Sequence, residues 1–149
     1  MSLPARILVA TDFSEAASAA FDYAIDLAKA LHAKITALHV YELPIYGFPS
    51  GTFVAPPELA TSIMTAAEQS LSNECAARAK LDVPIVQVVR QGLPWEEVHR
   101  VADEAGAGLI VIGTHGRKGL SHALLGSVAE KIIRTATRPV LTVHAPKGP

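Results

Sequence analysis

The chain has 149 residues and a mass of 15.7 kDa, the size of one ordinary domain, and we expect residues 1–149 to form a single domain. Half of the residues are hydrophobic and only 18% are charged, without charge blocks, which excludes a wholly disordered chain. The net charge of -1 excludes the broad basic surface that nucleic acids or anionic membranes require.

Five short runs rich in β-branched residues predict strands, and in most of them the apolar residues are nearly continuous rather than alternating. This pattern is typical of strands that are buried on both faces, as in a parallel sheet. The predicted strands are residues 6–10, 34–40, 85–89, 109–112 and 140–143.

Helical patterns separate these strands. The first helix begins after Ser14, a suitable N-cap, and the third begins at Pro94 and stops at Gly106. The second helix follows two prolines, and the fourth starts near Ser127. The apolar stripe predicted for the second helix consists of Leu59, Ile63, Ala66, Ala67 and Leu71.

Strict alternation of strands and helices predicts βαβ crossovers. The expected fold is α/β, a doubly wound five-stranded parallel sheet of strand order 3-2-1-4-5 with helices on both faces. Residues 41–56 are rich in proline and glycine and predict an irregular segment that carries the exposed aromatic residues Tyr46, Phe48 and Phe53. Such a segment could cover a ligand, form a partner surface or simply be mobile.

Ligands of open α/β sheets bind beyond the carboxyl ends of the strands. Two polar clusters stand there, Thr11-Asp12-Phe13-Ser14 after the first strand and residues 113–119 after the fourth. The second cluster has three glycines, which let backbone amides approach an anion, together with Arg117 and Lys118.

The segment from residue 113 to residue 138 is the basic part of the chain. It holds five bases and one acid, so an anion is expected near it. Ser127 and Glu130 have the spacing of a capping box at a helix N-terminus, which binds phosphate readily. The alternative is that Gly126 and Ser127 merely begin a helix.

The spacing Gly-x2-Gly-x9-Gly-Ser, formed by Gly113, Gly116, Gly126 and Ser127, resembles the universal stress protein family in the form that its ATP-binding branch carries. The resemblance extends over nearly the whole chain, from the polar end of the first strand through Gly92-x-Pro94 to the last strand.

The resemblance implies roles for individual residues. Asp12 and the backbone of Val40 would meet the adenine, with Thr11 nearby, Ile112 flanking the base and Gly113 close to the ribose. The residues implied at the phosphates are His115, Gly116, Arg117, Gly126, Ser127 and Val128. Asp12 has an alternative role as a turn or cap residue.

The leading hypothesis is an ATP-binding regulator that responds to stress or energy state, with Mg²⁺ arriving with the phosphates. No catalytic residue and no protein metal site is predicted. The P-loop and dinucleotide motifs are absent from the sequence. Two alternatives stay open: a nucleotide-free dimeric interaction module, and a slow ATPase or autophosphorylating protein.

The last predicted strand, Val140–Val143, should lie at a sheet edge, and apolar edges are templates for pairing with another chain. We expect a homodimer through this strand, as the resemblance also implies; the alternative is a monomer whose edge is covered by residues 144–149.

The single cysteine, Cys75, excludes an internal disulfide. Without a signal-like or membrane-spanning segment, the expected location is the cytoplasm.

Overall fold

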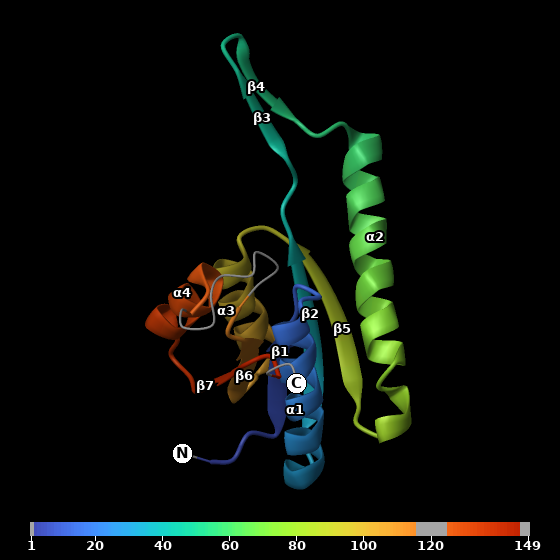
Figure 1. Cartoon of the computed structure of the whole chain (residues 1–149), viewed down its shortest axis with the longest axis vertical. Helices are drawn as coiled ribbons and strands as arrows, with labels where there is room; N and C mark the ends of the chain where they lie inside the picture. The colour runs from blue at the N-terminus through green and yellow to red at the C-terminus, as the bar shows by residue number, and fades with distance from the viewer. Residues whose placement is uncertain (1, 116–124, 147–149) are drawn as a thin grey trace.

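The computed structural model describes residues 2–115 and 125–146. Its main sheet is formed by β1 (Arg6–Ala10), β2 (Lys34–Tyr41), β5 (Ile85–Gln91), β6 (Leu109–Gly113) and β7 (Val140–Val143). All neighbouring strands are parallel, in the order β5-β2-β1-β6-β7 (Figure 1). The predicted α/β fold and its strand order are therefore confirmed.

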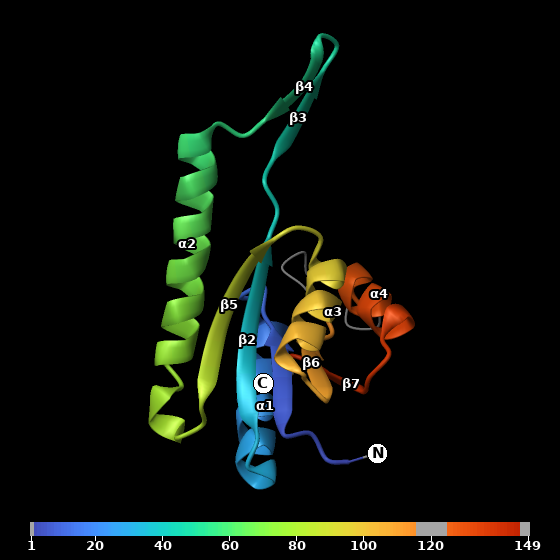
Figure 2. The same cartoon turned by 180° about the vertical axis from the view of Figure 1, so that it is seen from behind.

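Two layers of helices cover the sheet. On one face lie α1 (Glu15–Leu31) and α2 (Pro57–Ala76), which is followed by a short 3-10 helix (Ala79–Leu81). The opposite face is covered by α3 (Pro94–Ala105) and α4 (Ser127–Thr135), as Figure 2 shows from behind. None of the described helices combines the length and the apolar character that a bilayer crossing requires.

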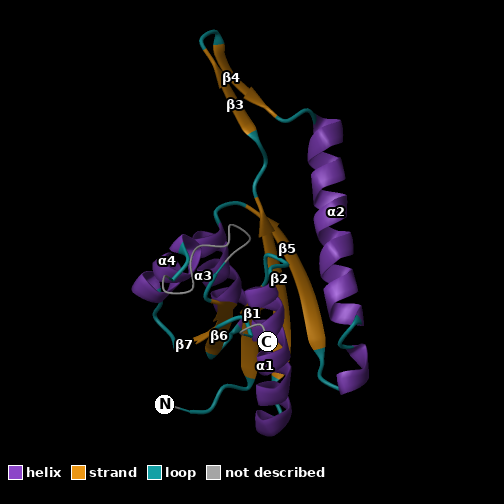
Figure 3. Ribbon diagram, in the orientation of Figure 1, coloured by secondary structure: helices purple, strands orange, loops and turns teal. Residues whose placement is uncertain are grey.

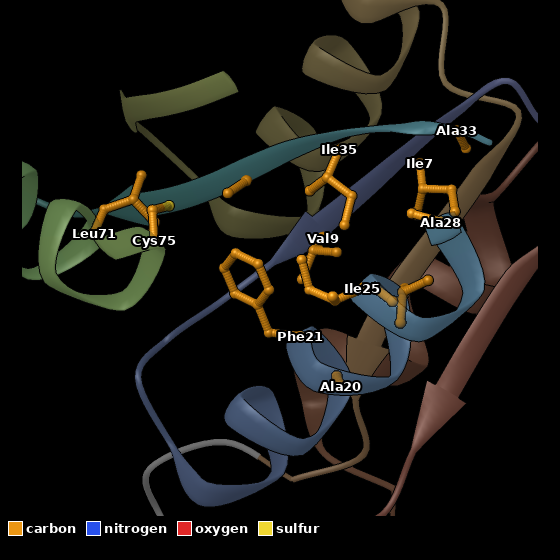
Figure 4. Packing of buried hydrophobic residues seen from close by; sticks show 13 residues of the cluster. Ile7, Val9, Ala20, Phe21, Ile25, Ala28, Ala33, Ile35, Leu71 and Cys75 are labelled. Carbon is orange, nitrogen blue, oxygen red and sulfur yellow. The ribbon is translucent and has the colours of Figure 1, made fainter. Parts of the chain in front are cut away.

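The larger core lies between the sheet and α1. Phe21 and Ile25 of α1 face Val9 of β1 and Ile35 of β2, and all four side chains are fully buried or nearly so (Figure 4). Because successive side chains of a strand point to opposite faces, Leu8 instead enters the second core, under α3 and α4. This placement requires apolar residues on both faces of the strand, as the nearly continuous apolar runs of the sequence predicted.

The predicted starts of α1 and α3 are confirmed. Ser14 is the N-cap of α1, and its Oγ accepts a hydrogen bond from the amide of Ala17 at 3.2 Å. Helix α3 begins at Pro94 and ends in Gly106, which has a φ of 63° that suits glycine.

The predicted capping box of α4 is wrong. The N-cap is Gly126, one residue earlier than expected, and it makes no side-chain capping bond. Ser127 is therefore the first helical residue, and Glu130 instead forms an ion pair with Arg134 one turn later. The predicted start of the fourth helix near Ser127 is confirmed.

The prediction of an irregular segment at residues 41–56 is also wrong. The strands β3 (Ile45–Phe48) and β4 (Gly51–Val54) pair there as an antiparallel hairpin (Figure 3). The prolines lie outside the ladder, so they do not interrupt it. The rings of Phe48 and Phe53 lie on one face of the hairpin, 5.4 Å apart in an edge-to-face contact.

The stripe predicted for α2 is covered along only part of its length. Ala67 and Leu71 are buried, as is Cys75, whereas Leu59 and Ala66 are exposed. A helix of 20 residues spans about 30 Å and a strand of seven about 23 Å, so α2 is longer than the strand on which it packs. Its N-terminal half extends past the sheet (Figure 1).

Candidate functional site

A cavity of about 640 Å³ lies at the carboxyl ends of β1, β2 and β6, next to the first turns of α3 and α4. A volume of this size suits a small-molecule ligand. All the described residues that were predicted for the site line it: Thr11, Asp12, Val40, Ile112, Gly113, His115, Gly126, Ser127 and Val128. The other two, Gly116 and Arg117, lie outside the described residues.

One part of the cavity is apolar. Leu38 and Ile112 come from the sheet, Val98 from α3 and Ile132 from α4, and each is at most 4% exposed. These side chains belong to the second core, which fixes their positions. The cavity therefore offers a preformed apolar wall that suits a flat ring.

The backbone of Val40 directs its polar groups toward this cavity. Alternate residues of a parallel strand bond to opposite neighbours. The carbonyl of Leu38 accepts from the amide of Thr11 on the β1 side, and that of Tyr41 accepts from Gly92 on the β5 side. Val40 therefore turns its N–H and C=O to the β1 side, beyond the end of β1 at Ala10. An adjacent donor and acceptor thus face the cavity.

The turn after β1 is held by its own side chains. Asp12 Oδ1 accepts a hydrogen bond from the amide of Ser14 at 3.0 Å, and Thr11 Oγ1 accepts from the amide of Phe13 at 3.1 Å. Phe13 adopts a φ of 65°, which such local bonds help to maintain. Asp12 therefore has the alternative turn role and also lines the cavity.

His39 connects the ends of β1 and β2, and the sequence analysis did not assign it to the site. Its Nδ1 lies 2.8 Å from the carbonyl oxygen of Thr11, which can only accept, so Nδ1 carries the proton. Its ring also packs on that of Phe13, with the centroids 4.4 Å apart. This histidine positions the turn that carries Asp12.

Gly113 lies against the backbone of α1. A Cβ at this position would stand 2.7 Å from the carbonyl carbon of Ala16 and 2.8 Å from the amide nitrogen of Ala17. Glycine therefore lets the N-terminus of α1 approach the end of β6. The resemblance implied a place near the ribose, and the structure adds a packing reason for the same residue.

The N-terminus of α4 opens into the cavity. The amide of Gly126 donates to the carbonyl of Thr114 at 2.7 Å, so it is already occupied. The amides of Ser127, Val128 and Ala129 belong to the first turn and have no acceptor in the described part of the chain. Together with the positive end of the helix dipole, they suit an anion.

Most of the basic residues of segment 113–138 are engaged away from the cavity. Lys131 lies over the ring of Trp95, Arg134 pairs with Glu130, and Arg138 pairs with Asp103. The remaining two, Arg117 and Lys118, lie outside the described residues. Among the residues described, the cavity lining includes two acids, Asp12 and Glu42, and no lysine or arginine. The start of α4 is therefore the described feature that best suits an anion.

His115 brings a further polar atom to the cavity. Its carbonyl accepts from Ser14 Oγ at 3.3 Å, which connects the end of β6 to the start of α1. Its Nδ1 is buried without a hydrogen-bond partner among the described residues. Burying a polar atom unpaired costs free energy, so this nitrogen is suited to meet a ligand.

Several lining residues were missed by the sequence analysis. The rule of strand ends, applied to β2 as it was to β1 and β6, identifies Tyr41 and Glu42. Pro94 and Val98 of α3 carry no such signal, because their place depends on how the helix packs. Across residues 2–115 and 125–146, no group of three or more His, Cys, Asp or Glu side chains could hold a metal ion.

Comparisons with known proteins agree with this architecture. The profile of the Universal stress protein family matches residues 5–144. Universal stress protein MJ0531 of Methanocaldococcus jannaschii is 34% identical over 144 residues, which cover 95% of this chain and 83% of that protein.

Two solved structures resemble this one. The structure of hypothetical protein MJ0577, from the same archaeon, has a TM-score of 0.79 at 25% identity and covers 96% of this chain and 97% of its own. A universal stress protein of Archaeoglobus fulgidus, solved in complex with dAMP, has a TM-score of 0.65 at 25% identity and covers 93% and 96%. From this family match over nearly its whole length, the chain belongs to the universal stress protein family.

Proposed function

We propose that the cavity binds ATP and that the protein is a regulator whose bound nucleotide responds to stress or energy state. The observation that carries the proposal is the combination, in one cavity, of an apolar wall and the amides of Ser127, Val128 and Ala129, which have no acceptor among the described residues. ATP matches this arrangement, because the faces of its adenine ring suit the apolar wall and its phosphates suit the amides.

The adenine fits the side of the cavity formed by β2. The N–H and C=O of Val40 can donate to and accept from the edge of the base, while Ile112 and Val98 contact its faces. Asp12 accepts a hydrogen bond from the adenosine. The structure of the Archaeoglobus protein with dAMP supports an adenine nucleotide in this family.

The phosphates fit the side formed by α4. Amides at a helix N-terminus bind phosphate through hydrogen bonds and the helix dipole, and they need no lysine. Arg117 and Gly116, in the sequence between β6 and α4 that lies outside the described residues, would add to this site. Mg²⁺ would be held chiefly by the phosphates themselves.

The experiment that tests the proposal removes one amide from α4 without removing the helix. Proline is tolerated as the first helical residue, and Gly126 already has the extended conformation, φ −61° and ψ 152°, that the residue before a proline requires. Ser127→Pro therefore deletes one N–H, whereas Ser127→Ala deletes only the hydroxyl and serves as the matched control.

Titration calorimetry with ATP and with adenosine should then separate the two parts of the site. A hydrogen bond to a charged group contributes about 1.5–3 kcal/mol, so Ser127→Pro should weaken ATP binding by roughly 10-fold to 150-fold. Adenosine binding should change little, and Ser127→Ala should resemble the wild type. Equal ATP affinity in all three proteins would contradict the phosphate site. No ATP binding by the wild type would favour a nucleotide-free interaction module.

We propose that the regulatory signal is transmitted by a homodimer whose two copies pair along β7. This strand ends the described sheet, and the carbonyls of Pro139 and Val143 bond to β6. By the alternation of the ladder, Thr142 directs its N–H and C=O to the open edge. Two copies related by a twofold axis can pair these edges antiparallel.

A substitution at Thr142 tests this dimer. Leu141 and Val143 pack against the core, so charges there would also perturb the fold. Thr142→Pro instead removes the outward N–H of an edge strand, where proline is tolerated. Thr142→Val keeps the backbone donor and is the control. Sedimentation should give a larger mass for the control than for Thr142→Pro; equal masses for the two would contradict the interface.

A further inference from the structure

The hairpin formed by β3 and β4, here named the arm (residues 45–54), projects from the body of the protein in both cartoon views (Figures 1 and 2). Residues 43–57 contain no charged side chain. The exposed fractions of Ile45, Phe48, Phe53 and Val54 are 70%, 55%, 58% and 69%. The arm is therefore an apolar surface that faces solvent.

Nothing in the described fold supports the arm well. Its two strands contact each other closely, and no other described helix or strand makes more than a weak contact with either. An isolated two-stranded hairpin is at best marginally stable in water, and it usually needs a helix or further strands against it. A defined arm of this composition implies a partner that covers it.

A second uncovered apolar surface follows the arm in sequence, at the start of α2. Leu59 and Met64, in the first half of α2, are 39% and 38% exposed, and Ile63 is half-buried. Burial against the sheet begins only at Ala67. The apolar stripe of α2 therefore continues past the sheet, which covers only its C-terminal half.

The chemistry of the arm selects a protein partner. The charges that flank it, Glu42 and Glu58, are both acidic, so they oppose contact with nucleic acid or with an anionic membrane. One copy carries both an arm and an uncovered helix half. Two copies related by a twofold axis can cover both surfaces at once, because each arm then lies on the helix of the other copy.

The exposed rings supply a substantial part of the area that such a contact needs. A phenylalanine side chain has about 150–250 Å² of surface, so the exposed fractions of Phe48 and Phe53 leave about 220 Å² per copy. Two copies contribute about 450 Å² from these rings alone, more than a quarter of the roughly 1,600 Å² of a standard interface. Ile45, Val54 and the helix residues add to this area.

We propose that the arm is an interface between copies of this chain, in which it packs on the N-terminal half of the partner's α2. This contact is separate from the edge of β7, because β5 and β7 form opposite edges of the main sheet and α2 packs beside β5. A protein that uses both contacts assembles beyond a dimer.

The test uses the Thr142→Pro protein, which should lose the proposed pairing along β7 and keeps the arm intact. Phe48→Ser with Phe53→Ser is added to that protein, and Leu3→Ser, at an exposed residue of the N-terminal segment, is the matched control. Circular dichroism checks the fold, and sedimentation velocity at tens of micromolar gives the mass. We expect a dimer for Thr142→Pro and for the Leu3 control, and a monomer for the arm variant.

Other results overturn the proposal. A monomeric Thr142→Pro protein, or an arm variant that stays dimeric, shows that the arm does not join copies. Binding of the intact protein to phosphatidylcholine vesicles that is lost in the arm variant assigns the arm to a membrane instead. ATP titration of the same variants separates this inference from the proposed function, because the arm substitutions should leave ATP affinity unchanged.

Discussion

Gly113→Ala is the most informative single substitution in the motif, because the structure gives this glycine a packing role in addition to its place at the cavity. The added Cβ would stand 2.7 to 2.9 Å from three backbone atoms of Ala16 and Ala17. Contacts this short cannot be relieved by rotating a side chain, so the first turn of α1 must move away from β6.

The expected cost follows from this geometry. Forcing one extra carbon into a well-packed site costs about 1–3 kcal/mol. For a chain of this length, 1 kcal/mol lowers the melting temperature by about 2–4 °C, so Gly113→Ala should melt roughly 2–12 °C below the wild type. ATP affinity should fall as well, since Asp12 and Ser14 stand on the turn that leads into α1.

The control is Gly47→Ala. An added Cβ at Gly47 meets no atom within 4 Å, and a surface change of this kind alters stability by less than about 0.5 kcal/mol. Thermal unfolding followed by circular dichroism compares the two variants. Equal melting temperatures, with ATP affinity lost only in Gly113→Ala, would refute the packing role and leave contact with the ribose as the reason for glycine.

Three further predictions concern the core and the turn after β1. Arg78, 6% exposed, bonds to Asp22, Glu74 and Ser18, so Arg78→Met should lower the free energy of unfolding by about 2–3 kcal/mol in urea titrations; an unchanged midpoint would contradict a stabilising role. Burial raises the pKa of the Cys75 thiol above its ordinary value of 9.0, because it disfavours the thiolate in the folded state. The contribution of Cys75 to the free energy of unfolding should therefore be fully present below pH 9 and be lost as the pH rises above it. Cys75→Ala should lack this loss, and identical pH profiles would argue against it. Asp12→Ala should weaken ATP binding by up to about tenfold in calorimetry. Asp12→Asn should weaken it less, because asparagine keeps an oxygen for the amide of Ser14. ATP affinities equal to that of the wild type in both variants would leave Asp12 a turn residue only.

The sequence predicted the main sheet well because each of its strands is a local signal. Residues 7–10 are apolar and include the β-branched Ile7 and Val9, and the parallel order follows from the alternation with helices. The polar clusters after β1 and β6 indicated the cavity for the same reason, since strand ends meet at one edge of the sheet.

The errors concern features that depend on tertiary contacts or on a partner. The N-cap of α4 lies at Gly126, whose amide bonds to the carbonyl of Thr114, a contact between residues distant in sequence that no local pattern predicts. The arm was missed because its strands have four residues each and stand among prolines that usually indicate loops. The role of Gly113 depends on how closely α1 approaches, which only coordinates show.

Amide hydrogen exchange of the wild-type protein with and without ATP and Mg²⁺ tests the central claim most directly. The proposed site predicts slower exchange on ATP addition at three places far apart in sequence: the turn at Thr11–Ser14, the end of β2 at Val40, and the amides of Ser127, Val128 and Ala129. Adenosine should protect the first two and leave α4 unchanged. Protection by ATP confined to other parts of the chain, or no protection at saturating ATP, would contradict a nucleotide site in this cavity.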